Sequence, residues 1–591
     1  ATVSRGGILF AGVAFLAVVF LSTKTLQTSV VRHLMTALVV GGILAASLGM
    51  WQLAQSRFDG FDLTDATEDG RWRHWRDMVP ALRDVWRSGT GLGTYRYANR
   101  PYQDHALPTT YWNADNEYLE LAVEGGLPAV ILIALGGGVL LLFLRTTCRL
   151  DALDDEETAD LGPVTAFVLV SQGLQAATDY GISIPANALT FAAMLGALTG
   201  GWGFAAKRDR EIDDGNSGIR WFAWLPMLML AGCAFVGYRE LSSAASVSHW
   251  LQSLPKWDAT DLRDWPVLSA DAAIARGERL IMQRPDDVDL HRNLGALHLL
   301  RYRQELFAKL QDPLQVSKPL SPEAAWLQTH PTNWDALCRH WVREGNAAAM
   351  DAIRKEPSFQ SHLPRAYEAY SQAHRLCPFD PATELNLAYL AYLCGSGQGD
   401  RTHWLRCAIV SAPGEPKILR SIAALTEPII EDDLAAFCWR RAIELDPESQ
   451  DKLYLAAVAR LSPAFALEHV VAADAPSLLR FAEVVDDPLI RTMAAERLAT
   501  LLQTGSVPSH GDTWMQLGRL AMLQGQTELA REHFRNAVQL EPLRWEFRLR
   551  YAQALEEQGD HAAALEQVKA GLLVAPEHPK LLEVQKRLLG R

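Results

Sequence analysis

Long apolar runs alternate with polar stretches along the first 240 residues, whereas apolar positions recur at helical spacing in the remainder. Each long run is close to the ~20 residues that a helix needs to cross a bilayer. Residues 1–240 therefore predict a polytopic bundle of about six transmembrane helices in an all-α protein. The predicted spans are Gly7–Ser22, Leu34–Ala54, Leu127–Leu144, Pro163–Ala177, Ala188–Ala206 and Ile219–Val236.

The second part of the chain, residues 241–591, carries small residues and prolines that recur every 34 positions. This is the period of the tetratricopeptide repeat, in which small residues lie where two helices cross and proline ends the second helix. Stacked helix pairs of this kind predict an α-solenoid whose concave face binds a protein or peptide partner. The spaced pairs are Pro413 and Pro447, Gly525 and Gly559, Ala530 and Ala564, and Pro542 and Pro576, and the best-matching unit also contains Trp514, Leu517, Gly518, Phe534 and Ala537.

Basic residues gather in three of the short loops between the apolar runs. Lys and Arg are enriched in cytoplasmic loops, so these three loops are predicted to be cytoplasmic. A large loop at residues 55–120 and the repeat domain after Tyr238 then both lie on the extracytoplasmic side of a multi-pass membrane protein. The loop residues concerned are Lys24 and Arg32, Arg145 and Arg149, and Lys207, Arg208 and Arg210.

The composition narrows the functional classes. A net charge of −13 argues against a nucleic-acid partner, because phosphate binding needs a basic surface. Seven cysteines without a CxxC pair predict buried free thiols. The first apolar run begins almost at once, without a basic segment and a cleavage site, so we expect a piece of a longer protein rather than a secretory signal peptide.

The loop at residues 55–120 is rich in arginine and tryptophan. Both residue types anchor proteins at lipid headgroups, which accounts for most of them. The alternative is recognition of an anion, since the guanidinium fork matches phosphate oxygens. The stretch from Gly89 to Gly93 predicts a tight turn near such an anion, although it lacks the context of a nucleotide-binding loop.

An acidic cluster follows that loop, directly before the third apolar run, in "TTYWNADNEYLELAVEGG". Charges at the edge of a bilayer are costly, so such a cluster indicates either a solvated helix end or a site. Asp115 can cap the helix that starts at Glu117, because Asp is a good N-cap and negative charge favours that end. Glu117, Glu120 and Glu124 are expected to be first-turn, solvated charges.

Five motifs occur in order along the first 206 residues: "SRGG" at Ser4, "RWRHW" at Arg71, "GTGLGTY" at Gly89, "NADNEYLELAVEGGLP" at Asn113 and "IPANALTFAAMLGAL" at Ile184. In this order and spacing they resemble the O-antigen ligase / polymerase family of bacterial membrane proteins, whose members often carry a tetratricopeptide tail. Members have about twice as many spans, so the chain resembles the C-terminal half of their membrane domain.

The resemblance implies a metal-independent, inverting glycosyltransferase-type ligase or polymerase that needs no cofactor. It would transfer a glycan from an undecaprenyl pyrophosphate carrier to a lipid or protein acceptor, or to a growing chain, at the outer face of the bacterial cytoplasmic (inner) membrane. By position in the family motifs, Arg5 and Arg71 would bind the pyrophosphate, and Asn116 is placed with them. Arginine can stabilise a pyrophosphate leaving group without a metal.

The chain departs from the family at one position, where Asp115-Asn116 stands in place of a His-Asn pair. That histidine is the family's proposed base, and Asp115 can serve as a general base if burial raises its pKa. The base and the cap remain alternative roles for Asp115, and His105 is a second candidate base.

A second functional class remains open, a non-catalytic membrane scaffold that uses its tetratricopeptide solenoid to hold partners of an envelope or exopolysaccharide assembly machine. The enzyme is favoured because arginine is kept at both family positions, which indicates that an anionic carrier is still bound.

Overall fold

The computed structural model describes residues 70–103, 111–151, 161–177, 187–197, 240, 242–257, 262–312, 320–426 and 429–590. These residues form α-helices and short 3₁₀-helices and no strand, so the all-α prediction is confirmed for them. The chain divides into two compact units. Unit 1 contains Ala1–Gln304, Glu368–Asp380 and Val410–Pro413, and unit 2 contains Glu305–Tyr367, Pro381–Ile409 and Gly414–Arg591.

The helices of unit 1 include α5 (Gly70–Val85), α6 (Tyr95–Ala98), η1 (Arg100–Tyr102), α7 (Glu117–Asp151), α8 (Leu161–Ala176), η3 (Leu262–Asp264) and α11 (Val267–Ile281). Three helices contribute residues to both units, namely α12 (Val288–Gln311), α16 (Pro357–Leu376) and α18 (Gln398–Ser411).

Unit 2 contains α13 (Pro322–Gln328), α14 (Pro331–Arg343), α15 (Ala347–Arg354), α17 (Pro381–Cys394), α19 (Pro416–Leu425), α20 (Asp432–Leu445), η4 (Pro447–Ser449), α21 (Gln450–Arg460), α22 (Pro463–His469), α23 (Ala475–Val485), α24 (Pro488–Gln503), α25 (Gly511–Leu523), α26 (Thr527–Leu540), α27 (Trp545–Glu557), α28 (His561–Val574) and α29 (Pro579–Leu589).

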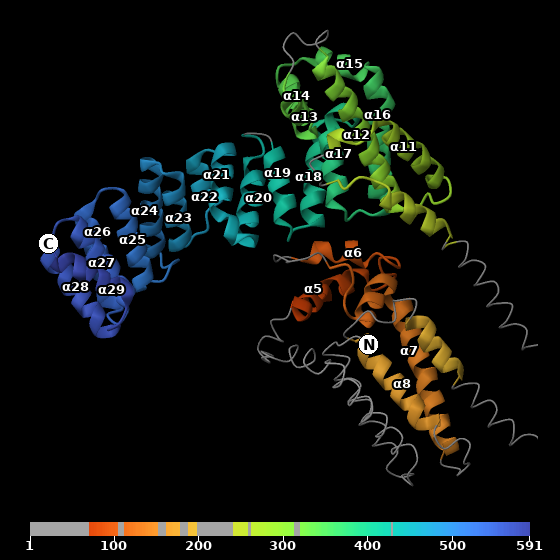
Figure 1. Cartoon of the computed structure of the whole chain (residues 1–591), viewed down its shortest axis with the longest axis horizontal. Helices are drawn as coiled ribbons and strands as arrows, with labels where there is room; N and C mark the ends of the chain where they lie inside the picture. The colour runs from red at the N-terminus through yellow and green to blue at the C-terminus, as the bar shows by residue number, and fades with distance from the viewer. Residues whose placement is uncertain are drawn as a thin grey trace, which may run out of the picture. The chain divides into compact units, whose positions relative to one another are not determined.

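Helix α7 contains a segment, Glu117–Thr146, that is long and apolar enough to cross a membrane. Many apolar side chains after Gly126 are exposed, with Leu132 and Leu141 more than 60% accessible, as expected of a surface that lipid covers. Helix α8 packs beside it, and the Tyr118 hydroxyl donates a hydrogen bond to the Gly173 carbonyl oxygen at 3.0 Å (Figure 1). This agrees with the span predicted at residues 127–144.

The other predicted spans are described in part. Helix α8 covers most of the segment at 163–177, and a shorter apolar helix, Asn187–Ala197, covers half of the segment at 188–206. The segments at 7–22, 34–54 and 219–236 lie outside the described residues. The six-span bundle therefore stays a prediction.

The second part folds into paired helices, as the 34-residue period predicts. Helices α25 and α26 pack against each other, as do α27 and α28, and they follow one another along the stack (Figure 1). Ala530 is fully buried and Phe534 is 2% exposed. A Cβ added at Gly518 would lie 2.4 Å from the Phe534 ring, so glycine is needed where the two helices cross. The tetratricopeptide-like solenoid is confirmed.

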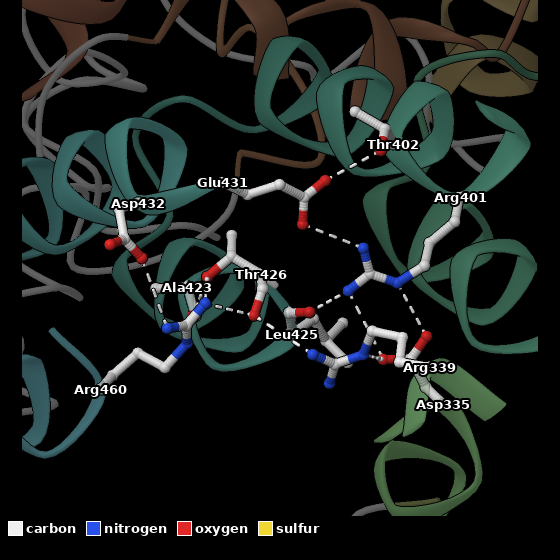
Figure 2. Close-up of polar contacts among 10 residues, drawn as sticks. All are labelled: Asp335, Arg339, Arg401, Thr402, Ala423, Leu425, Thr426, Glu431, Asp432 and Arg460. Atoms are coloured by element: carbon white, nitrogen blue, oxygen red, sulfur yellow. Dashed lines mark hydrogen bonds and ion pairs between the residues drawn. The ribbon is translucent and has the colours of Figure 1, made fainter. Parts of the chain in front are cut away.

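A buried ionic network joins α14, α18, the end of α19 and the residue before α20 in unit 2 (Figure 2). The fully buried Arg401 of α18 donates to Asp335 of α14 at 2.7 Å and to Glu431 at 3.0 Å, and it also donates to the Leu425 carbonyl oxygen at the end of α19. Arg339 donates to the same Asp335 at 2.9 Å. Two cations and two anions thus balance inside the solenoid, which is the condition under which buried charge is tolerated.

Five cysteines of the second part of the chain are free thiols. Cys338, Cys377 and Cys438 are buried, and Cys394 and Cys407 are partly buried. Burial raises the pKa of Cys338 and of Cys438 to about 12. These two thiols are protonated and unreactive at neutral pH. The prediction of buried free thiols is confirmed for Cys338, Cys377 and Cys438.

Candidate functional site

Helix α5 carries the "RWRHW" motif and presents one face to the interior of unit 1. His74, Met78 and Ala81 lie on that face at helical spacing and are almost fully buried. Arg73 and Arg76 lie on the opposite, exposed face. Arg73 and Arg76 are therefore surface charges, and their anchoring at lipid headgroups stays a prediction.

The glycine-rich stretch after α5 is a tight turn, as predicted, and it packs onto a break in α7. Gly89, Gly91 and Gly93 have φ of +68°, +107° and +77°, a left-handed region that favours glycine. The break lies at Gly126, where φ is +57°. A Cβ on Gly89 would lie 2.1 Å from the Glu124 carbonyl oxygen. The main chain of the turn lies directly against the main chain of α7. This close approach explains the glycines at 89–93 and at 125–126 without an anion.

The turn is held to α7 by main-chain hydrogen bonds. The Gly91 amide donates to the Glu124 carbonyl oxygen at 2.8 Å, and the Thr90 amide donates to that of Val123 at 3.1 Å. The Leu127 amide, which begins the apolar run, donates to the Trp86 carbonyl oxygen at 2.6 Å. The extracytoplasmic loop of the prediction is thus docked on the end of the membrane helix.

Glu117 and Glu120 lie in the first turn of α7, as expected, but the expectation that the acidic residues of this helix are solvated is wrong. Glu117 and Glu124 are 7% and 5% exposed, and Glu120 is partly buried. Glu124 Oε1 accepts the Tyr95 amide at 2.9 Å, and Glu120 Oε2 accepts the Ala114 amide at 2.9 Å. Their carboxylates satisfy main-chain donors of the loop, which compensates for the cost of burying them.

Asn116 is the residue that caps α7. Its Oδ1 accepts the Leu119 amide at 3.0 Å, and its carbonyl oxygen accepts the Glu120 amide at 2.9 Å. The prediction that Asp115 is the cap is therefore wrong by one residue, because the cap is Asn116. Asp115 itself is half-buried and adopts φ of +51°, a left-handed conformation that is uncommon outside glycine. The structure places it immediately before the first turn.

Sequence reasoning missed His74, which lies at the centre of this cluster. It is fully buried, its ring stacks on Tyr111 with centroids 3.8 Å apart, and its Nε2 lies 2.8 Å from the Tyr95 hydroxyl. Gln103 Nε2 lies 3.2 Å from Nδ1 and also donates to Asn99 Oδ1 at 2.6 Å. A Gln103 amide that donates to Nδ1 leaves the proton of a neutral imidazole on Nε2, directed at Tyr95.

Tyr95 connects this histidine to the acidic residues. Burial raises the pKa of its hydroxyl, and the negative charges of Glu120 and Asp115 raise it further. The tyrosine is therefore a neutral hydrogen-bonding group at all physiological pH values. Trp75 Nε1 donates to the Ala114 carbonyl oxygen at 2.6 Å, so α5 also fixes the residue directly before Asp115. The spacing of His74 and Trp75 to Met78 in α5 was the sequence signal for this inward face.

The predicted site residues are only partly brought together. Arg71 lies in the first turn of α5, one turn before His74, and only its backbone is described. Arg5 and His105 lie outside the described residues. Arg96 and Arg100, which follow the glycine turn, form ion pairs with aspartates rather than remaining open to an anion.

The cluster offers acid–base groups and no metal site among the residues that the structure describes. No three His, Cys, Asp or Glu side chains in the described ranges lie close enough to hold an ion. What remains is a half-buried carboxylate, Asp115, beside a neutral tyrosine and buried glutamates, at the end of an apolar helix. A carboxylate in such a place can accept a proton.

Two segments of the chain match known families. Residues 1–134 match the O-antigen ligase family. That segment contains α5, the glycine turn, α6 and the first turns of α7, so the whole cluster lies within the match. Residues 494–579 match a tetratricopeptide repeat family, which is a protein-interaction module. Both predicted resemblances are confirmed, and O-antigen ligases are proteins of the bacterial inner membrane.

Solved structures resemble the chain only in part. The type IV pilus biogenesis factor PilW is 16% identical, with 43% of this chain and 97% of that chain covered and a TM-score of 0.20. The P58(IPK) TPR domain is 13% identical, with 61% and 97% covered and a TM-score of 0.18. The structure of Naa15/Naa10 bound to HypK-THB is 15% identical, with 76% of this chain and 67% of that chain covered and a TM-score of 0.25. Identities and scores this low carry no functional argument. No curated protein matches the chain.

Proposed function

We propose that the protein transfers a saccharide from an undecaprenyl pyrophosphate carrier to an acceptor hydroxyl at the outer face of the bacterial inner membrane. The observation that carries this proposal is the match of residues 1–134 to the O-antigen ligase family, because it contains the whole cluster around Asp115. The acceptor is a lipid, a protein or a growing glycan chain. The solenoid would hold a protein partner at the same site of synthesis.

The proposed reaction is a single displacement. The acceptor oxygen attacks the anomeric carbon and forms a new glycosidic bond, while the bond from that carbon to the pyrophosphate oxygen breaks. The electron pair of the broken bond leaves with undecaprenyl pyrophosphate, and the hydroxyl proton passes to a base. Attack from the side opposite the leaving group inverts the anomeric centre. Two needs follow, a base for the hydroxyl and cations for the pyrophosphate.

Asp115 is the proposed base. Asn116 caps α7, so the N-cap role that competed with the base for Asp115 belongs to its neighbour. A left-handed backbone at a residue other than glycine costs free energy and is found preferentially at functional sites. Asn116 is proposed to orient the carrier as well as cap the helix, and His105 is the alternative base.

Arg5 and Arg71 are the proposed pyrophosphate ligands. Arg71 lies in the first turn of α5, the helix whose inward face carries His74, so its backbone lies one turn from the cluster. Arginine neutralises the leaving group through paired hydrogen bonds, and lysine keeps the charge but not the fork.

Deletion of the gene in its host tests the function, with accumulation of lipid-linked glycan as the readout. The parent gene should restore transfer, whereas Arg71→Lys should lower it by about tenfold or more, because a charge-assisted bond is lost. Arg73→Lys, on the exposed face of the same helix, is the matched control and should restore transfer fully. Full transfer by both Arg71→Lys and Asp115→Asn would favour the non-catalytic scaffold instead.

A further inference from the structure

Helix α6 is only four residues long, and its side chains meet two different sets of partners within unit 1. Tyr95 contacts the site, with its hydroxyl on His74 and its amide on Glu124. The next two residues contact the first turn of α12. Arg96 Nη2 donates to Asp289 Oδ2 at 2.8 Å, and the Tyr97 hydroxyl donates to Asp289 Oδ1 at 3.1 Å.

A second aspartate extends this contact. Arg292, one turn after Asp289 on α12, donates to it at 2.7 Å and lies 3.5 Å from Asp380. Arg100, directly after α6, lies 3.9 Å from the other oxygen of Asp380, which is 2% exposed. Three guanidinium groups and two carboxylates therefore alternate between the loop and the first repeats.

The contacts around Asp289 are the strong part of this network. Bonds in which both partners are charged are stronger than neutral ones, and partial burial reduces their screening by water and salt. Asp289 accepts three hydrogen bonds, and the Arg96 guanidinium also lies 4.7 Å from the centre of the Tyr97 ring. Burial raises the pKa of Tyr97, so its hydroxyl stays a donor.

A helix of one turn does not hold its own conformation in water, because its few hydrogen bonds do not offset the entropy of ordering it. The orientation of Tyr95 therefore depends on what α6 packs against. On the loop side, α6 is held by Asn99, whose Nδ2 donates to the Tyr95 and Tyr111 carbonyl oxygens at 2.6 and 3.0 Å. On the other side it is held by the aspartates of the repeats.

We propose that Asp289 and Asp380 are positioning residues, through which the first repeats brace α6 and hold Tyr95 against the site. The solenoid is then part of the transfer machinery as well as a surface for a partner. The catalytic consequence rests on the proposed function, whereas the brace itself does not. The brace also supports a common side of the membrane for the loop and the repeats, since two segments in contact cannot lie on opposite sides.

Hydrogen exchange of the full-length protein in detergent tests the brace directly. The amides of Tyr97, Ala98 and Asn99 bond to carbonyl oxygens of Thr94 and Tyr95 and report on α6. Asp289→Ala should speed their exchange by about tenfold or more, because α6 opens more often. Asp286→Ala, three residues earlier and exposed, is the matched control and should leave them unchanged.

Variants on the loop side show whether faster exchange comes from loss of the contact or from misfolding of the repeats. Arg96→Ala and Tyr97→Phe should speed the same amides without touching α12, and Arg96→Ala combined with Asp289→Ala should be no faster than the more affected single variant. Unchanged exchange in Arg96→Ala and Asp289→Ala, or fully additive effects, would overturn the proposal.

Activity separates the brace from the function. If the parent transfers glycan, Asp289→Ala should lower kcat by about tenfold with KM for the carrier little changed, because Tyr95 is misplaced while the arginines still bind. A tenfold rise in KM for the carrier with kcat unchanged would overturn the positioning role. If the parent transfers nothing while α6 exchange responds as predicted, the brace stands and the proposed function fails.

Discussion

At the start of α7, two neighbouring residues divide tasks that the sequence alone cannot separate. Asn116 accepts the main-chain amide that an N-cap must satisfy, and Asp115 precedes it with a left-handed backbone. Asn tolerates that backbone nearly as well as Asp does. Asp115→Asn should therefore fold like the parent and lower glycan transfer by ~100-fold or more, since it removes the base. Initial rates of transfer in membranes measure this.

Asn116→Ala is the companion variant to Asp115→Asn, because it removes the helix cap and keeps the proposed base. It should cost about 1 kcal/mol of helix stability through loss of the cap, seen as faster exchange of the Leu119 amide. Transfer at the parent rate by Asp115→Asn would make Asp115 structural, and His105 would be the next residue to test.

The contact between the glycine turn and α7 makes a sharp stability prediction. Gly89→Ala would place a Cβ 2.1 Å from the Glu124 carbonyl oxygen at a positive φ, so it should destabilise the loop by about 2 kcal/mol or more. Gly93→Ala has the same backbone restriction and open space around the Cβ, and should cost only about 1 kcal/mol. Exchange of the Gly91 amide compares them, and equal effects would contradict the packing account.

The sequence patterns predicted where the candidate site around Asp115 lies, but they did not predict the roles of all its residues. The motif order pointed to the start of α7, and Asp115 does lie there. The roles of Glu124 and His74 depend on partners 29 and 21 residues away, Tyr95 in both cases. A single sequence shows local periodicity but not which distant segments meet. That is why the glutamates were expected to be solvated and the histidine was missed.

Among the elements, the repeats were the most predictable. A 34-residue period fixes where two helices cross, and the buried Ala530 and Phe534 follow from it. Helix α7 contains both the helix predicted to start at Glu117 and the span predicted at residues 127–144, which meet at a kink at Gly126. The ionic network around Arg401 could not be predicted, because its members come from separate repeats and break the apolar pattern.

That network supplies a prediction for the solenoid. Arg401→Met leaves Asp335 and Glu431 buried without their shared cation, so it should destabilise unit 2 by about 3–5 kcal/mol. Arg480→Met, in an exposed pair with Asp451, should change little. Thermal unfolding of the full chain, followed by circular dichroism, measures both.

The pH dependence of the Arg401→Met deficit has a definite sign. Burial raises the pKa of Asp335, and the two arginines oppose that shift in the parent. Without Arg401 the folded-state pKa rises further above the unfolded value, so the folded state holds the extra proton. Stability of the variant relative to the parent should therefore fall as pH rises above the ordinary range of a carboxyl group. A deficit that shrinks with rising pH would contradict the network account.

For the whole molecule, the main open prediction is its sidedness. The loop at 55–120 and the repeat domain are predicted to be extracytoplasmic. Protease added to intact spheroplasts should then digest the repeats while a cytoplasmic marker protein stays whole. Digestion of the repeats only after lysis would reverse the predicted topology, and with it the face of the membrane at which transfer takes place.

The account as a whole depends on whether the membrane part is an enzyme. The most direct measurement uses the full-length protein in proteoliposomes with an undecaprenyl pyrophosphate-linked glycan and an acceptor glycan, and follows both the new glycosidic product and free undecaprenyl pyrophosphate. We predict that the two appear in equal amounts, that a chelator has no effect, and that Asp115→Asn abolishes both. Absence of product from the parent protein, with the carrier demonstrably bound, would contradict the account and leave a membrane scaffold.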